Sequence, residues 1–285
     1  MSIVEAPRLG EVVTHDIYGV TIRFEAIVNA LREAGLDTSY ARKLTPKSAF
    51  SRACRTLRKT RAIDQLKEVS PYIQYQLTRK ALSDAGVFDY TLDHIVTLDT
   101  ENGSIRCDTS QEVADKAQQM LDSELGTRKS GDITKIVQKL FKDNGDLFPI
   151  CPRKGVAYFV PDEHRDFTNK VEKFMTAVGG TLGRFPIMKG TEEGNRSVRE
   201  CMDHGLNTMI TELQEVADKF SVKTREKTIK ENKEEWDRVT FKLRNYSSYL
   251  GGKVKELEDR MAEARQKVRE RLAGIQAEIA ASEKS

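Results

Sequence analysis

Apolar positions near the N-terminus recur at helical spacing. Phe24, Ile27, Val28 and Leu31 lie three or four residues apart, which places them on one face of a helix. Gly35 is typical of the residue that follows a last helical turn. A short β-prone stretch over 17–22 precedes this helix, and Thr45–Pro46 predicts the start of another. The buried stripe of that second helix is expected to be Ala49, Phe50, Ala53, Cys54 and Leu57.

The middle of the chain mixes strand and helix patterns. Residues 72–77 and 90–98 are β-prone, and Asn102–Gly103 is a tight-turn signal before a possible return strand at 104–107. These segments predict a small antiparallel sheet. Helices are then predicted at 111–125 and 132–142, strands at 146–150 and 156–160, and a further helix from Asp162 to Gly179–Gly180.

Residues 110–160 therefore run helix, helix, strand, basic turn, strand. This is the order of the latter half of a winged helix-turn-helix, with 152–155 as the tip of the wing. The same order also occurs in winged helices that bind proteins and in other α+β domains. Under the DNA-binding interpretation, the exposed basic residues would be Lys135, Lys139, Arg153 and Lys154.

From residue 191 onward there is no proline, and apolar residues recur at three- and four-residue steps. This pattern indicates a long helical hairpin or coiled coil. The polar run 221–235 is expected to be a turn or a solvated helix, and Gly251–Gly252 is a second possible break. A coiled coil would give self-association through residues 200–280, most simply as a dimer. The same pattern also fits helices that fold back on the rest of the chain.

Together these patterns predict an α+β protein that is mainly helical. We expect an N-terminal helical segment at 1–67 and a winged-helix-like body with a small antiparallel sheet at 68–185. The long helical hairpin or coiled coil would occupy 186–285.

Charge becomes informative when it is examined locally. The net charge of the whole chain is only +3, yet residues 41–61 contain eight basic residues and no acidic one. These residues are Arg42, Lys43, Lys47, Arg52, Arg55, Arg58, Lys59 and Arg61. On a helix, Arg52, Arg55 and Lys59 would share one face, away from the apolar stripe.

Such a face repels itself unless anions neutralise it. Phosphates would do so with release of counterions, which favours nucleic acid as the partner. Carboxylates of this chain or of a partner protein would serve equally well. Two interpretations therefore stand, a nucleic-acid-binding protein and a protein-interaction factor that binds through its long helices.

Catalytic and cofactor motifs are not found in the sequence. It contains no GxxxxGK[ST] or GxGxxG phosphate loop, no GxSxG elbow and no HExxH metal motif. Its four cysteines are far apart and lack zinc spacing. Residues 162–166 are expected to be a solvated helix start, and 179–184 a helix end and turn. We therefore predict no cofactor, no metal and no enzyme activity; a cleft that collects His94, His164 and carboxylates would favour an enzyme with dispersed residues instead.

Membrane and export signals are also not found. No stretch approaches the roughly 18 apolar residues of a membrane span, and the N-terminal residues do not form a signal peptide. The expected location is the cytoplasm, with reduced thiols.

Three stretches carry a resemblance. They are Ser48–Ala53, the segment from Asp132–Thr134 through Lys154–Pro161, and Tyr249–Gly251 before the final helix. Together they resemble an uncharacterised family, a domain of unknown function, carried by bacterial and archaeal plasmids and phages. Typical members read GGVYFVP where this chain reads KGVAYFVP from Lys154. The resemblance implies a protein of a mobile element and identifies no catalytic residue.

Overall fold

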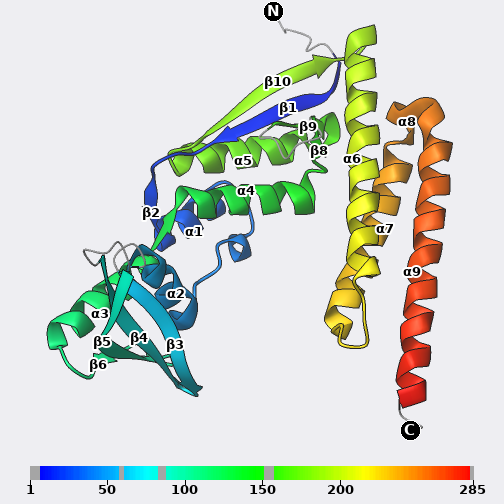
Figure 1. Ribbon diagram of the computed structural model, residues 1–285. Coiled ribbons are helices and arrows are strands. Elements are labelled where there is room, and N and C mark those ends of the chain that lie inside the picture. The colour runs from blue at the N-terminus through cyan, green and yellow to red at the C-terminus, as the bar shows by residue number, and fades with distance from the viewer. Residues whose placement is uncertain (1–6, 58–60, 83–87, 151–156, 283–285) are drawn as a thin grey trace, which may run out of the picture. The chain divides into compact units, whose positions relative to one another are not determined.

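The computed structural model describes residues 7–57, 61–82, 88–150 and 157–282, in two units (Figure 1). The first unit combines Met1–Asp16, Gln138–Glu172 and Thr181–Ser285, and the second combines Ile17–Val137 and Lys173–Gly180. The division falls within α4 (Ser130–Asn144) and α5 (Arg165–Ala177). Both units are thus discontinuous in sequence, whereas the sequence patterns predict three consecutive segments.

The first unit contains a four-stranded antiparallel sheet in the order β10-β1-β9-β8. Its strands are β1 (Arg8–Asp16), β8 (Phe148–Pro149), β9 (Ala157–Pro161) and β10 (Thr181–Met188). Residues 179–184 were expected to form only a helix end and turn. Gly179, at φ +76°, does end α5, but the chain then enters β10, which pairs with β1 from Thr181↔Asp16 onward.

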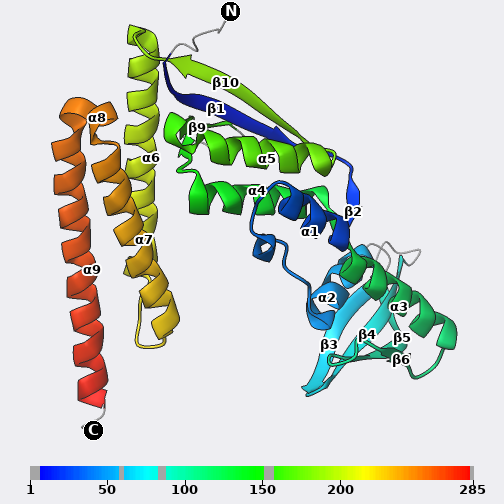
Figure 2. The same ribbon diagram turned by 180° about the vertical axis from the view of Figure 1, so that it is seen from behind.

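Long helices complete the first unit. They are α6 (Glu192–Asp218), α7 (Glu226–Asn245) and α9 (Val254–Ser282), with the short α8 (Ser247–Leu250) and η3 (Gly251–Lys253) before α9. The three long helices lie side by side in both views (Figures 1 and 2). The break predicted at Gly251–Gly252 is confirmed, since Gly251 adopts φ +57°. In the segment 221–235 only 221–225 are non-helical, because α7 begins at Glu226.

The apolar positions predicted for a coiled coil pack against one another within this chain. The buried core runs from Leu206 and Ile210 of α6, through Trp236 and Leu243 of α7, to Leu257 of α9. It also includes Phe148 and Phe159 of the sheet, so the helices fold back on β8 and β9 as the second interpretation had it. Gly205 allows this approach, because a Cβ there would lie 3.1 Å from the Phe148 ring.

The second unit contains a four-stranded antiparallel meander in the order β3-β4-β5-β6. Its strands are β3 (Arg61–Val69), β4 (Tyr72–Leu82), β5 (Phe88–Asp99) and β6 (Ile105–Cys107). The tight turn predicted at Asn102–Gly103 joins β5 to β6, with Gly103 at φ +73°. Strand β3 was not predicted, because the basic pattern before it suggested that the helix continued.

Helices α2 (Pro46–Leu57) and α3 (Gln111–Gly126) contribute the core that covers one face of this meander. Ala49, Phe50 and Cys54 of α2 are buried against the sheet residues Ile73 and Leu98, as the predicted apolar stripe requires. Thr45 caps α2 by accepting the Ser48 amide at 3.3 Å.

Shorter elements complete the second unit. Helix α1 (Phe24–Glu33) ends before Gly35, which has φ +70°, as predicted. A 3-10 turn, η1, covers Thr38–Tyr40. The strand expected over 17–22 is shorter: Gly19, at φ +68°, interrupts it, and β2 (Thr21–Arg23) pairs with β7 (Thr127–Lys129).

The α+β class, the antiparallel sheets and the long C-terminal helices are therefore confirmed. The segments expected for a winged helix occur in order, and β8 pairs with β9 in antiparallel fashion. However, α3 belongs to the second unit, whereas β8 and β9 belong to the first, where β9 also pairs with β1. Within the described ranges, no helix is long and apolar enough to cross a bilayer.

Candidate functional site

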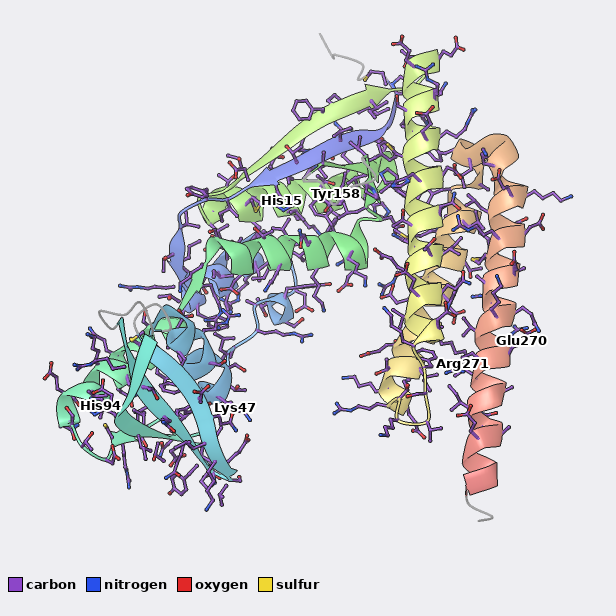
Figure 3. All side chains as sticks on the ribbon, viewed as in Figure 1. His15, Lys47, His94, Tyr158, Glu270 and Arg271 are labelled. Carbon is purple, nitrogen blue, oxygen red and sulfur yellow. The ribbon has the colours of Figure 1, made fainter. Side chains whose placement is uncertain are left out.

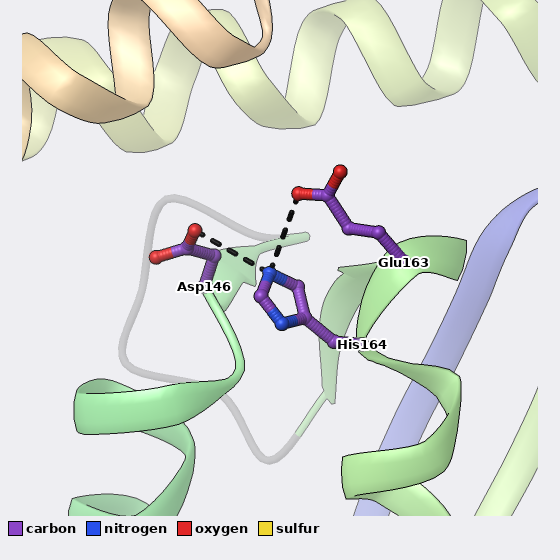
Figure 4. Close-up of side chains that lie close together, drawn as sticks. All are labelled: Asp146, Glu163 and His164. Carbon is purple, nitrogen blue, oxygen red and sulfur yellow. Dashed lines mark ion pairs between the residues drawn. The ribbon is translucent and has the colours of Figure 1, made fainter.

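A cluster of polar side chains forms in the first unit around the hydroxyl of Tyr246. Asp146 lies in the turn after α4, Glu163 and His164 lie on the 3-10 turn η2 (Asp162–His164), and Lys242 lies one turn before Tyr246 on α7. Tyr246 follows the last residue of α7 and its amide still donates to the Lys242 carbonyl, so the two side chains lie on the same side of the helix end. Figure 4 shows the two carboxylates converging on the His164 ring.

Local backbone geometry places Asp146 in this cluster. It adopts φ +45°, in the left-handed region, which aspartate tolerates better than most residues. Helix α4 ends just before it, with the Gly145 amide donating to the Phe141 carbonyl. A Cβ at position 145 would lie 2.7 Å from the Phe141 ring, so glycine fits this tight exit from the helix.

The Tyr246 hydroxyl faces two carboxylates, which can only accept, and an imidazole nitrogen, which donates or accepts according to its tautomer. Its oxygen lies 2.7 Å from Asp146 Oδ2, 2.5 Å from Glu163 Oε1 and 3.0 Å from His164 Nε2. A phenol has one proton to donate. It can therefore donate a hydrogen bond to only one carboxylate at a time. The other carboxylate needs another hydrogen-bond donor or a positive charge nearby.

Lys242 supplies part of that positive charge. Its ammonium lies 2.9 Å from Asp146 Oδ1, and its side chain is only 4% exposed. Burial alone would raise the pKa of Asp146, but the hydrogen bond with His164 and the charge of Lys242 hold that pKa well below its usual range. Burial and the two carboxylates raise the pKa of Tyr246, so its hydroxyl keeps its proton.

Asp146, Glu163 and His164 together have the composition of a metal-binding group. One ligand atom from each lies within 4.8 Å of the other two. Carboxylate oxygens and imidazole nitrogen are common ligands of divalent transition metals. The cluster can therefore act as a hydrogen-bonded structural hub or as a cation site.

A second histidine cluster lies in the second unit, where Figure 3 labels His94. His94 Nδ1 lies 2.5 Å from Thr109 Oγ1, and His94 Nε2 lies 3.4 Å from Asp93 Oδ1. The register of β4 and β5 shifts between Leu77 and Thr78, opposite Asp93, and Arg79 Nη2 of β4 lies 3.8 Å from Asp93 Oδ1. His94 and His164 thus belong to different units, each with its own acidic neighbours.

The predicted basic residues of α2 lie in the second unit, with apolar residues toward the sheet. Two of them form ion pairs within the chain. Lys47, labelled in Figure 3, lies 2.7 Å from Glu68, with both side chains about half exposed, and Arg52 lies 2.9 Å from Asp132. Arg42 and Lys43, just before α2, are exposed.

The other predicted basic residues are less fully described. Lys135 and Lys139 of α4 are exposed, and Lys139 lies 3.6 Å from Asp143. The backbones of Arg55 and Arg61 lie in α2 and β3, and their side chains fall outside the described part of the structure. The positions outside the described residues are Arg58, Lys59, Arg153 and Lys154.

Comparison with known proteins gives one match. The model of DUF6744, a family of unknown function, matches residues 8–281. The chain belongs to this family. No curated protein and no solved structure matches it. The resemblance to a domain of unknown function is thereby confirmed, and membership in DUF6744 identifies no site residue.

Sequence reasoning missed most of the Tyr246 cluster in this DUF6744 chain. Glu163 and His164 were expected to be solvated, and Tyr246 lies in the C-terminal region whose apolar pattern predicted only a helical hairpin or coiled coil. Lys242 and Asp146 carried no signal, because a lysine in a charged helix and an aspartate after a glycine are ordinary. The spacing of Lys242 and Tyr246 could have placed them on one face, but their partners lie about 80 to 100 residues earlier in the sequence.

Proposed function

We propose that this protein binds nucleic acid through the basic surface formed by α2 and the residues leading into it. The supporting observation is the orientation of α2. Ala49, Phe50 and Cys54 face the sheet, so the helix directs its basic residues to its other faces. Residues 41–61 contain no carboxylate to neutralise them.

The ion pair of Lys47 does not prevent this function. The Lys47–Glu68 pair is exposed on both sides, and exposed pairs contribute little free energy because water and salt screen them. A phosphate can replace such a carboxylate at low cost. Arg42 and Lys43 are exposed beside them, which extends the surface along the chain.

Two finer parts of the proposal rest on the sequence pattern alone. Base contacts from Lys135 and Lys139, and self-association through 200–280, stay predictions. Since the apolar seam of α6, α7 and α9 is buried within one chain, the phosphate contacts proposed for α2 require no second copy. An origin in a plasmid or phage is likewise a prediction from the resemblance.

The test is fluorescence anisotropy with a labelled random duplex and a labelled single strand at about 50 and 200 mM salt. The test variant carries Arg42→Glu, Lys43→Glu and Lys47→Glu. The matched control carries Lys227→Glu, Lys230→Glu and Lys233→Glu on α7, which changes the net charge equally at exposed positions of the other unit.

We expect at least about tenfold weaker binding at the lower salt for the α2 variant, and a shallower salt dependence from the lost phosphate contacts. The control should bind like the original protein. Equal loss in both variants would indicate only a general charge effect. No binding by the original protein at the lower salt would refute the proposal and favour a protein partner for these basic residues.

A further inference from the structure

We infer that Asp146, Glu163 and His164 bind a divalent transition-metal ion, with Zn²⁺ as the first probe. This site lies in the first unit and is independent of the nucleic-acid surface proposed on α2. The inference begins from ligand chemistry. One imidazole nitrogen and two carboxylate oxygens suit Zn²⁺ or Mn²⁺ better than Mg²⁺ or Ca²⁺, which prefer oxygen ligands alone.

The spacing of the ligand atoms fits this assignment. His164 Nε2 lies 3.4 Å from Asp146 Oδ2 and 3.5 Å from Glu163 Oε1. Zinc bonds of about 2.1 Å in a tetrahedron separate neighbouring ligand atoms by about 3.4 Å. Two of the three edges therefore already have the length that a bound ion needs.

The charges of the cluster also favour a cation. Two carboxylates face one ammonium, that of Lys242, and the phenol offers a single proton between them. With neutral imidazole the cluster carries an excess of one negative charge. A divalent ion would supply the missing positive charge at the point where both carboxylates converge on His164 (Figure 4).

Neighbouring groups preorganise the ligands. Lys242 binds Oδ1 of Asp146, and the Tyr246 hydroxyl holds Oδ2 at 2.7 Å, beside His164. Such outer contacts orient metal ligands and raise affinity. Glu163 is the most exposed ligand, with 57% of its side chain accessible, so an ion and water can reach the site from its side.

The test is calorimetric titration of the full chain, first stripped of metal with a chelator, with Zn²⁺, Mn²⁺ and Mg²⁺ in separate runs. We expect one Zn²⁺ or Mn²⁺ per chain and weaker binding of Mg²⁺. Glu163→Gln and His164→Ala should each weaken this binding about a hundredfold. Their matched controls are Glu193→Gln and His204→Ala on α6, which lie outside the cluster.

Folding is checked in each variant by circular dichroism and by the fluorescence of Trp236, the only tryptophan. Glu163→Gln is the most informative variant, because its exposed side chain can change without loss of buried packing. The visible spectrum of bound Co²⁺ gives a second readout of coordination by nitrogen and oxygen. Unchanged binding in folded Glu163→Gln and His164→Ala would overturn the inference, as would the absence of binding by the original protein.

Discussion

Two lysines of this chain form ion pairs of similar length in different surroundings. Lys242 lies 2.9 Å from Asp146 and is 4% exposed, whereas Lys47 lies 2.7 Å from Glu68 and is 48% exposed. The buried pair stands in the first unit, next to Tyr246 and His164. The exposed pair stands in the second unit, at the edge of the basic surface of α2.

The difference in burial distinguishes a lysine that stabilises the fold from a lysine that is available to bind another anion. Removing one partner of a buried pair leaves an uncompensated charge in a medium of low dielectric constant, which is costly. Removing one partner of an exposed pair leaves a charge that water can solvate. Lys242 is therefore committed to holding α7 against the Asp146 turn, while Lys47 can exchange its carboxylate for another anion.

The largest effect is expected from Asp146→Ala. This change leaves Lys242 buried without its carboxylate, and we expect the free energy of unfolding of the first unit to fall by about 3–5 kcal/mol. Urea denaturation followed by Trp236 fluorescence measures this, since Trp236 is buried in the core of the same unit.

A double variant sharpens that result. Asp146→Asn with Lys242→Met removes both charges together and should recover much of the lost stability, because no unpaired charge remains. Asp143→Ala, an exposed acid on α4, is the control and should change stability little. If Asp146→Ala cost no more than Asp143→Ala, the contrast between buried and exposed pairs would fail.

The next largest effect is a dependence on pH. The pKa of Asp146 is held below its unfolded value of about 3.9. Its contribution to stability is therefore fully present above that pH and is lost as the pH falls through the folded pKa. Unfolding curves between about pH 5 and 2 should show the first unit losing stability, and Asp146→Asn should flatten the part of the slope that Asp146 causes.

Whether the sequence predicts a structural feature of this chain depends on how close in sequence the residues that form it are. Gly35, Thr45 and the Asn102–Gly103 turn act through neighbours a few residues away, and all three were predicted correctly. The apolar stripe of α2 was likewise readable from its spacing. These features need no knowledge of which segments meet in three dimensions.

The missed features depend on distant partners. Strands β1 and β10 pair over a separation of about 170 residues. The sequence of neither segment, considered alone, indicated a strand. Lys242 became structural only because α7 packs beside the Asp146 turn, about 100 residues earlier in the sequence. The local excess of basic residues indicated the charged surface of α2. Only the fold shows that Lys242 is buried whereas Lys47 is exposed.

A smaller effect is expected from Tyr246→Phe. The ring still fills the core and packs against Phe148, but the hydroxyl that serves Asp146 and Glu163 is lost. Because the Asp146 carboxylate is mostly buried, losing its hydrogen bond from this hydroxyl should lower the free energy of unfolding by about 1–3 kcal/mol. Denaturation followed by Trp236 fluorescence measures the change. Tyr249→Phe is the matched control, and a loss of the same size there would show that the hydroxyl cluster is not the cause.

The smallest effect is expected from Arg52→Ala on α2. Its guanidinium forms a partly exposed ion pair with Asp132, in which the Arg52 side chain is 31% accessible and the Asp132 side chain is 17% accessible. A pair of this exposure contributes roughly 0.2–1 kcal/mol, because water screens it and ordering the arginine costs side-chain entropy. Amide hydrogen exchange of β4 and α2 measures this change in the second unit, where the fluorescence of Trp236 does not report. A loss as large as that of Asp146→Ala would mean that the basic residues of α2 are structural, and the argument that they are available to bind phosphate would fail with it.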